Sequence, residues 1–373
     1  MTQTKVEAPF VENNNPFRNL IINGDMQIAQ RSTSTTGVAN NSDEGYNSLD
    51  RFALQYYGNE GGAATMSQDT TVPSDTSFGV RKKSLKVDVT TADTSLGATG
   101  IIALKHTVEA QYIHHSGWDF TSSSSNITLS FWARSVKAGT YCVMFRDHDA
   151  SGERYFVKEY TLVANTWKHI EIVVPGDSNL VFNADNGEGL EVRWILAAGD
   201  DRNDATAGSW YAPGSAYENS TNNQVNFYDS TDNNFFLTGV QLEVGDQATD
   251  FEHLPFDVQL ARCKRYYERI EYEGMIATMT ATSTSNAYGR IECEVEKRTD
   301  PTVTLPTAGQ STNQTSVLSG SGSYPSTTGS HAVGNPTPLG FRLQATSYDS
   351  LETGGGLMLY VNGTVHIEFD AEL

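Results

Sequence analysis

The long polar segment 199–234 holds the residues best suited to bind a ligand. Trp210, Tyr211 and Tyr217 lie there among Asn, Ser and Asp residues, and Asn222 follows them. A sugar ring stacks on an aromatic face while its hydroxyl groups bond to amides and carboxylates, so this mixture suits glycan recognition. The same aromatic side chains could instead anchor the segment on its own domain. We name these four residues as the candidate glycan-binding residues.

Acidic residues in and before this segment raise the question of a metal ion. The run 147–152 (DHDASG) matches the opening of a calcium loop, yet Lys158 stands where a bidentate carboxylate is required. The run therefore indicates a hairpin turn. The carboxylates of segment 199–234 that could together hold a structural Ca²⁺ are Asp200, Asp201, Asp204, Asp229 and Asp232. Because clustered acids are more often solvated, we expect no metal and no other cofactor.

The sequence contains none of the common catalytic motifs. It has no G-x-S-x-G nucleophile elbow, no phosphate-binding P-loop, no dinucleotide fingerprint and no H-E-x-x-H zinc motif. A carboxylate pair for glycoside hydrolysis leaves no sequence signature, because any two acids can converge in space. We expect no enzymatic activity, with glycoside hydrolysis as the alternative.

Composition and charge limit the partners of this chain. Its 373 residues carry a formal net charge of −20, which disfavours nucleic acid and anionic membranes because Lys and Arg drive such binding. The N-terminal residues have neither the basic nor the apolar region of a secretory signal, and no apolar run reaches the roughly 18 residues that insert in a membrane. Three widely spaced cysteines do not indicate a disulfide framework, which is consistent with synthesis in a cytoplasm.

Short apolar runs with a period of two, separated by turn clusters, predict an antiparallel β-sandwich. In the first part of the chain the expected strands are 20–28, 52–57, 84–89, 101–104, 127–133, 141–145, 155–160, 170–174, 190–196 and 235–244. In the last part they are 341–345, 357–361 and 365–369, with Asn362-Gly363 as a two-residue hairpin turn.

One helix is predicted between these two β regions, over residues 255–270. Its apolar stripe is formed by Leu260, Cys263, Tyr267 and Ile270. Their spacings of three, four and three residues place them on one helix face. The stripe is also a short heptad seam, so it could pack on its own domain or between subunits. We name these four residues as a candidate oligomer interface.

Five short segments, in this order, resemble those of phage and prophage tail-fibre proteins. They are 19–25 (NLIINGD), 49–52 (LDRF), 238–245 (TGVQLEVG), 263–267 (CKRYY) and 297–302 (KRTDPT). The resemblance implies a structural virion component, often trimeric, with a jelly roll similar to carbohydrate-binding modules. The resemblance implies no catalytic residue in this chain.

Together these observations predict an all-β chain in four parts: 1–17, a flexible docking arm; 18–254, a carbohydrate-module-like jelly roll; 255–270, a linking α-helix; and 271–373, a smaller β-sandwich. We expect a homotrimeric tail-fibre or appendage protein of a phage virion, assembled in the host cytoplasm. It would attach to host-surface polysaccharide or to other tail or capsid proteins. The alternatives are a polysaccharide-degrading tailspike and a purely architectural capsid-fibre or tail-adaptor protein.

Overall fold

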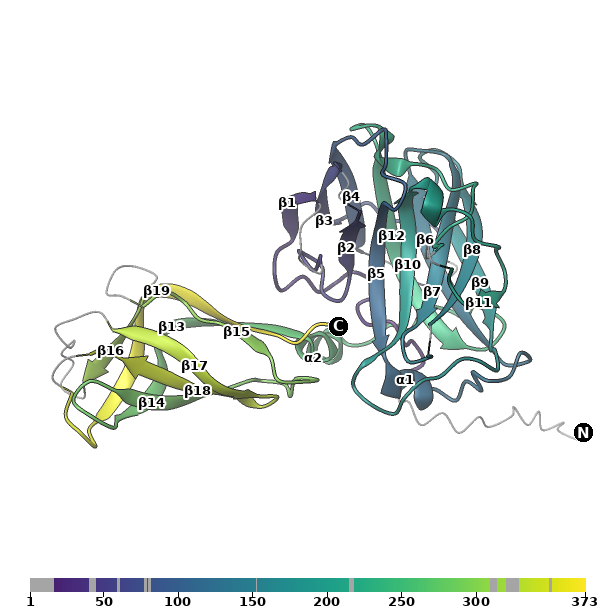
Figure 1. Ribbon diagram of the computed structural model, residues 1–373. Coiled ribbons are helices and arrows are strands. Elements are labelled where there is room, and N and C mark those ends of the chain that lie inside the picture. The colour runs from purple at the N-terminus through teal and green to yellow at the C-terminus, as the bar shows by residue number, and fades with distance from the viewer. Residues whose placement is uncertain are drawn as a thin grey trace, which may run out of the picture. The chain divides into compact units, whose positions relative to one another are not determined.

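The computed structural model describes residues 17–39, 45–58, 61–76, 79, 82–151, 153–214, 218–308, 314–319, 329–348 and 351–373. Nearly all of the predicted docking arm, and Tyr217, therefore lie outside the described residues. The chain divides into two compact units, residues 1–256 with Leu373 and residues 257–372. Both units are built mainly from β-strands (Figure 1). In the part of the chain that the structure describes, no helix is long and apolar enough to cross a membrane.

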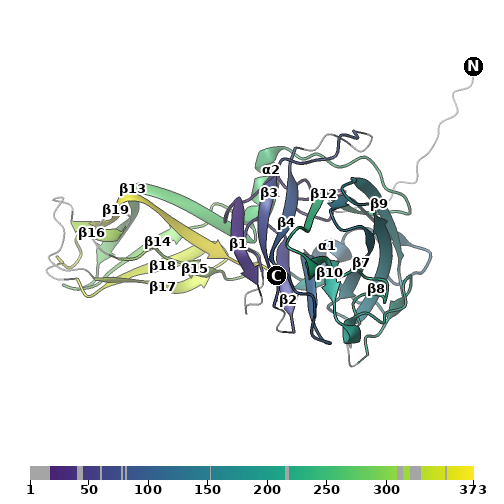
Figure 2. The same ribbon diagram turned by 90° about the horizontal axis from the view of Figure 1, so that it is seen from above.

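The first unit is a sandwich of two six-stranded antiparallel sheets (Figures 1 and 2). Sheet A has the order β1 (Ser34–Ala39), β3 (Ala63–Asp69), β4 (Ser84–Thr91), β12 (Asn234–Val244), β6 (Asn126–Ser135) and β9 (Lys168–Pro175). Sheet B has the order β11 (Trp210–Tyr211), β8 (Arg154–Leu162), β7 (Gly139–Asp147), β10 (Glu188–Ala198), β5 (Ile101–Glu109) and β2 (Ala53–Tyr57). The short helices of this unit are α1 (Ala110–His114), η1 (Asp200–Arg202) and η2 (Phe227–Asp229). The predicted all-β jelly-roll class is confirmed.

Alternating side chains fill the space between the two sheets. On edge strand β9, Ile170, Ile172 and Val174 are at most 5% exposed, whereas Val173 between them is 40% exposed. This is the period of two expected for a strand with one face on a core. Both sheets contribute large buried rings to this core: Trp194 and Tyr141 lie on sheet B, and Phe131 and Phe235 lie on sheet A.

Residues 20–28 do not form the strand that was predicted. Asn23 and Met26 have φ values of 63° and 61°, which a β-strand does not allow. The backbone instead turns repeatedly, and the side-chain oxygen of Asn23 accepts a hydrogen bond from the N–H of Ile28 at 2.9 Å. The apolar residues of this segment are still buried, Leu20 and Met26 among them, so the segment fills the core without joining a sheet.

The predicted helix is real but ends earlier than expected. Helix α2 spans Phe256–Lys264, and strand β13 (Tyr267–Ala281) begins three residues later. Tyr267 therefore pairs with Asp370 in a sheet, and Ile270 also lies on β13, so the helical stripe predicted over residues 260–270 is wrong. Pairing with the C-terminal strand outweighs the local helical pattern. Cys263 and Tyr267 are buried, while Leu260 and Ile270 are partly exposed.

The second unit is one antiparallel network of seven strands around its own core, which contains Phe341 and Phe369. Its order is β15 (Thr302–Thr304), β19 (Gly356–Asp370), β13, β14 (Ala287–Glu292), β18 (Gly340–Thr346) and β17 (Ser330–Thr337), with β16 (Thr315–Ser319) also paired to β19. In the described part of this unit, these strands form one hydrogen-bonded sheet.

The hairpin predicted at Asn362-Gly363 is wrong, because these residues lie within the continuous strand β19. Val361 pairs with Gly274 and Thr364 with Glu273, so two extra residues form a bulge. Gly363 has a φ of 105°, which suits glycine in a bulge as well as in a turn. Both halves of β19 pair with β13, and this is why the chain continues straight on.

Candidate functional site

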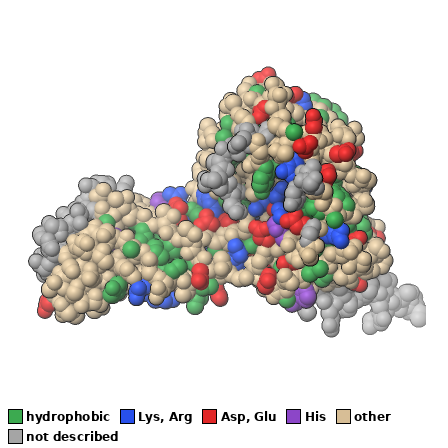
Figure 3. Space-filling view, viewed as in Figure 1, with side chains coloured by type: hydrophobic (Ala, Val, Ile, Leu, Met, Phe, Trp, Pro, Cys, Tyr) green, Lys and Arg blue, Asp and Glu red, His purple; other side chains and the backbone are tan. Residues whose placement is uncertain are grey.

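The outer face of sheet B, turned away from the core, carries charged side chains in the middle of its strands. Arg193 of β10 lies opposite Lys105 of β5. Glu191 of β10 lies opposite Arg146 of β7, which lies opposite Tyr155 of β8. Directly opposite residues share one face of a sheet, so these five side chains form a continuous strip. Figure 3 shows Lys and Arg side chains gathered over β5 and β10, with Asp and Glu side chains beside them.

Glu191 is the buried anionic centre of this strip, at 1% exposed. Its carboxylate contacts Nε of Arg193, and lies 3.3 Å from Nε2 of His148 and 4.0 Å from Nζ of Lys105. Burial alone would raise the pKa of Glu191, but attraction to these three groups holds it well below its usual range. The carboxylate therefore stays ionised, and it holds Arg193 in a fixed position.

A hollow of about 160 Å³ opens on this face of sheet B, and we call it the arginine hollow. Its polar and aromatic lining includes Tyr57, Arg146, Glu153, Arg193, Arg202 and Asn219. Tyr57 comes from β2, whereas Arg146 and Arg193 come from β7 and β10. Arg202 and Asn219 belong to segment 199–234, so the predicted binding segment does contribute to the hollow, through residues that were not named from the sequence.

Several lining groups hold one another in place. Nη2 of Arg146 lies 2.5 Å from Oε1 of Glu153, and the hydroxyl of Tyr155 donates to Oε2 of Glu153 at 2.9 Å. Burial raises the pKa of Glu153, yet the bond and charge of Arg146 outweigh it and lower this pKa overall. Nε of Arg202 donates to the carbonyl of Thr99 at 3.0 Å. These bonds fix the positions of the charges before any ligand arrives.

Two features of the hollow suit a sugar ligand. Tyr57 is 40% exposed, and Cζ of Arg193 lies 5.2 Å from its ring centroid in a cation–π contact. Asn219 is only 2% exposed, and its Nδ2 has no hydrogen-bond partner among the described residues. A buried donor without an acceptor is uncommon in folded proteins. The hollow thus combines an exposed ring with an unused amide donor.

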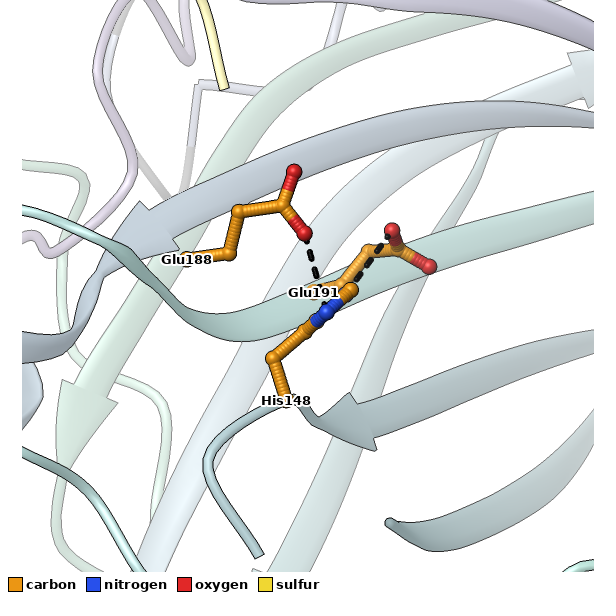
Figure 4. A group of neighbouring side chains, drawn as sticks. All are labelled: His148, Glu188 and Glu191. Atoms are coloured by element: carbon orange, nitrogen blue, oxygen red, sulfur yellow. Dashed lines mark hydrogen bonds and ion pairs between the residues drawn. The ribbon is translucent and has the colours of Figure 1, made fainter.

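His148 lies beside this site, between two carboxylates (Figure 4). Its Nδ1 is 2.9 Å from Oε2 of Glu188, and its Nε2 is 3.3 Å from Oε2 of Glu191. Within the described ranges this is the only group of three metal-ligand side chains whose donor atoms lie within 4.8 Å of one another. Both ring nitrogens face carboxylates, and Arg193 already pairs with Glu191. An imidazolium therefore fits this charge pattern better than a divalent cation.

The structure places Trp210 and Tyr211 on the short strand β11, paired with β8. Nε1 of Trp210 donates to the carbonyl of Pro175 at 2.7 Å, and its ring lies 5.6 Å from that of Phe156. The hydroxyl of Tyr211 donates to the carbonyl of Glu218 at 2.8 Å. Both side chains are partly buried, so they anchor the segment on sheet B, as the second interpretation of the sequence proposed.

The other residues named from the sequence do not gather at one point. Asn222 is exposed and donates to Asp204 at 3.2 Å, while Asp229 pairs with Lys137 at 2.5 Å. Tyr217 is outside the described residues. The aspartates of segment 199–234 form no metal-ligand group in the part of the chain that is described.

Sequence reasoning missed the arginine hollow because its residues come from distant strands. One signal was available: Lys105, Glu191 and Arg193 are charged residues inside otherwise apolar strands. A charge in such a place is buried, and a buried charge needs a partner or a function. Which partner it has depends on the strand order, which a single sequence does not reveal.

No family model and no curated protein matches this chain. Among solved structures it is similar to a CBM4 carbohydrate-binding module, with 14% identity and a TM-score of 0.32 over 60% of this chain and 99% of that one. It is also similar to a family 11 carbohydrate-binding module from Clostridium thermocellum in complex with a mixed-linked tetrasaccharide. The identity is 13% and the TM-score 0.27, over 60% of this chain and 99% of that one. A third similar structure is the enzymatically active domain of tailspike protein 4 of bacteriophage CBA120. The identity is 12% and the TM-score 0.30, over 62% of this chain and 22% of that one.

Proposed function

We propose that this chain is a glycan-binding, non-catalytic protein of a phage virion appendage, and that the arginine hollow is its glycan site. The observation that carries the binding role is the exposed ring of Tyr57 beside fixed charged groups and the unused donor of Asn219. Sugars are bound in this manner, by stacking on an aromatic face and by hydrogen bonds to polar groups that are already oriented.

The carboxylates at the hollow support binding over hydrolysis. A glycoside hydrolase needs one carboxylic acid with a raised pKa to protonate the leaving group. Burial raises the pKa values of Glu153 and Glu191, but their cationic partners outweigh it and lower both. Both groups are therefore ionised and unable to act as that acid. A tailspike-type hydrolase is therefore disfavoured at this site.

The virion role in this proposal rests on the order of the five tail-fibre-like segments in the sequence. With it come the proposed homotrimer, contacts with other tail or capsid proteins, assembly in the host cytoplasm and a host-surface polysaccharide as ligand. Imaging of labelled particles tests this part: we expect the protein on a tail fibre or other appendage. Its absence from the particle would overturn the virion role.

The binding role is tested with two matched aromatic variants. Tyr57→Ala removes the exposed ring at the hollow, and Tyr288→Ala removes a ring of the second unit that is 37% exposed and lies 5.1 Å from Arg342. We expect a purified chain to bind host-envelope glycans on an array, and Tyr57→Ala to weaken calorimetric affinity about tenfold or more. Tyr288→Ala should bind normally. Unchanged binding by Tyr57→Ala, or an equal loss in both variants, would contradict the site.

A further inference from the structure

The arginine hollow has the opposite charge to the protein that contains it. The whole chain has 45 Asp and Glu against 25 Lys and Arg. Arg146, Arg193 and Arg202 line the hollow from three different elements, and Glu153 is the only acidic residue among its described lining residues. A concave site lined by one sign of charge concentrates ligands of the other sign. On so acidic a surface this is a local exception that favours an anion.

The charge of the hollow is not cancelled by the carboxylate behind it. Glu191 pairs with Arg193, but it also faces His148 and Lys105. Because His148 also pairs with Glu188, the balance depends on the lining, where three guanidinium groups stand against the carboxylates of Glu153 and Glu191. The guanidinium of Arg193 consequently keeps part of its positive potential for a ligand, while its position is fixed by the Glu191 contact.

The hydrogen-bonding capacity of the hollow is also one-sided. Nδ2 of Asn219 and Nε of Arg146 are buried donors without a hydrogen-bond partner among the residues that the structure describes. A carboxylate only accepts hydrogen bonds, whereas a sugar hydroxyl can also donate. Unused donors next to guanidinium groups therefore call for an acceptor with negative charge, and planar guanidinium groups match a carboxylate well.

We infer that the arginine hollow binds a carboxylate-bearing sugar unit, of the hexuronate or sialic-acid class, within a longer glycan. This inference rests on the proposed glycan-binding function and deepens it. The volume of about 160 Å³ is below the roughly 300–1,000 Å³ of sites for drug-sized ligands, so it accommodates one sugar unit. The carboxylate lies toward Arg146, Arg193 and Asn219, and the ring lies against Tyr57.

The test compares paired ligands and matched variants of the full chain. The ligands are oligosaccharides containing hexuronate or sialic acid, the same compounds with the carboxylates reduced to alcohols, and sulfated neutral oligosaccharides. Arg146→Gln removes one cation, and Asn219→Asp replaces the unused donor by a negative charge of nearly the same shape. Arg290→Gln is the control, because Arg290 is also paired with a carboxylate, that of Glu292 at 3.0 Å, but in the second unit. Circular dichroism checks that each variant is folded.

We expect at least one acidic oligosaccharide to bind about tenfold or more tightly than its reduced form, since charge-assisted bonds are lost on reduction. Arg146→Gln and Asn219→Asp should abolish this preference, and Arg290→Gln should keep it. Equal binding of both forms would overturn the carboxylate inference while leaving the glycan site in place. A preference for sulfated ligands would also overturn it. Binding of no oligosaccharide by the wild-type chain would overturn the proposed function itself.

Discussion

His148 in the first unit lies between two carboxylates, whereas His331 in the second unit lies between two hydroxyl groups. Nδ1 of His331 is 2.8 Å from the hydroxyl of Thr315, and its Nε2 is 2.7 Å from the hydroxyl of Tyr348. Burial alone lowers the pKa of His331 to about 4. For His148, burial also lowers the pKa, but the bonds to the carboxylates of Glu188 and Glu191 outweigh it and raise this pKa overall. The pKa values of these two histidines are therefore shifted in opposite directions.

The first prediction concerns His148→Gln. Because the pKa of His148 is raised in the folded protein, its stabilising charge is fully present below the unfolded pKa of about 6.5 and is lost as pH rises through the folded pKa. The variant should therefore be less stable than wild type by about 1 kcal/mol at pH 6, with the difference shrinking toward pH 9. Urea unfolding of both proteins at several pH values measures this. A difference that grows with pH would show that the imidazole is bound neutral.

The second prediction has the opposite sign and concerns His331→Asn. Between about pH 4 and 6.5 the unfolded chain binds a proton that the folded His331 does not, so wild-type stability falls as pH drops through this window. The loss can reach about 3 kcal/mol, and Asn, which cannot titrate there, should remove this dependence. Thermal unfolding of both proteins from pH 4 to 7 gives the slope of stability against pH for each. Parallel slopes for the two proteins would contradict a buried neutral histidine.

At the level of elements, the tail-fibre-like segments hold the ends of the strands and helices together. Oδ1 of Asn19 accepts hydrogen bonds from the N–H groups of Ile21 and Leu242, and its Nδ2 donates to the carbonyl of Val240. Residues 19–25 are thereby tied to 238–245. These bonds are internal to the fold, so the segments indicate architecture and not a ligand site.

A second pair of segments is joined in the other unit. Nζ of Lys297 is fully buried, donates to the carbonyl of Lys264 at 2.6 Å and pairs with Glu268 at 2.6 Å. Nε of Arg298 donates to the carbonyl of Ala371 at 2.6 Å. The start of segment 297–302 therefore fixes the end of helix α2 and the end of the chain's last strand.

Strands with one clear apolar face could be predicted from the sequence. A strand of small and polar residues, and a segment bent by side-chain hydrogen bonds, could not. Strand β9 was expected at 170–174 and found at 168–175, because its alternation is strict. Strand β3, with the sequence AATMSQD, has small and polar residues and was missed. The apolar residues of segment 20–28 predict a strand, but side-chain hydrogen bonds bend this segment. Periodicity reports burial, and it does not report which hydrogen bonds the backbone makes.

The third prediction separates the two interpretations of Trp210. Trp210→Phe keeps a ring against Phe156 but loses the bond from Nε1 to the carbonyl of Pro175. We expect a loss of about 1 kcal/mol in unfolding free energy and unchanged glycan affinity. Urea unfolding and calorimetric binding of the same sample decide it. Weaker binding with unchanged stability would place the sugar on Trp210 and return the site to β11.

At the scale of the whole molecule, the two units carry separate cores, and the candidate site lies in the first of them. The stripe that motivated a trimer from the sequence does not exist as a helical seam, since α2 ends at Lys264. Cys263 and Tyr267 are buried. The homotrimer accordingly rests on the resemblance of the five segments alone, and its interface is not assigned to these residues.

The fourth prediction joins oligomeric state to binding. One hollow of about 160 Å³ contacts a single sugar unit, so we expect weak affinity for a short oligosaccharide. Three linked sites can bind one polymer together, and such linkage raises apparent affinity by about 10²–10⁴-fold without any new contact.

Three chains of 40.7 kDa give about 122 kDa, which light scattering after gel filtration would detect. The trimer should bind immobilised polysaccharide at least about a hundredfold more tightly than the free oligosaccharide. A 40.7 kDa species at micromolar concentration, with equal affinity for both ligands, would contradict this prediction.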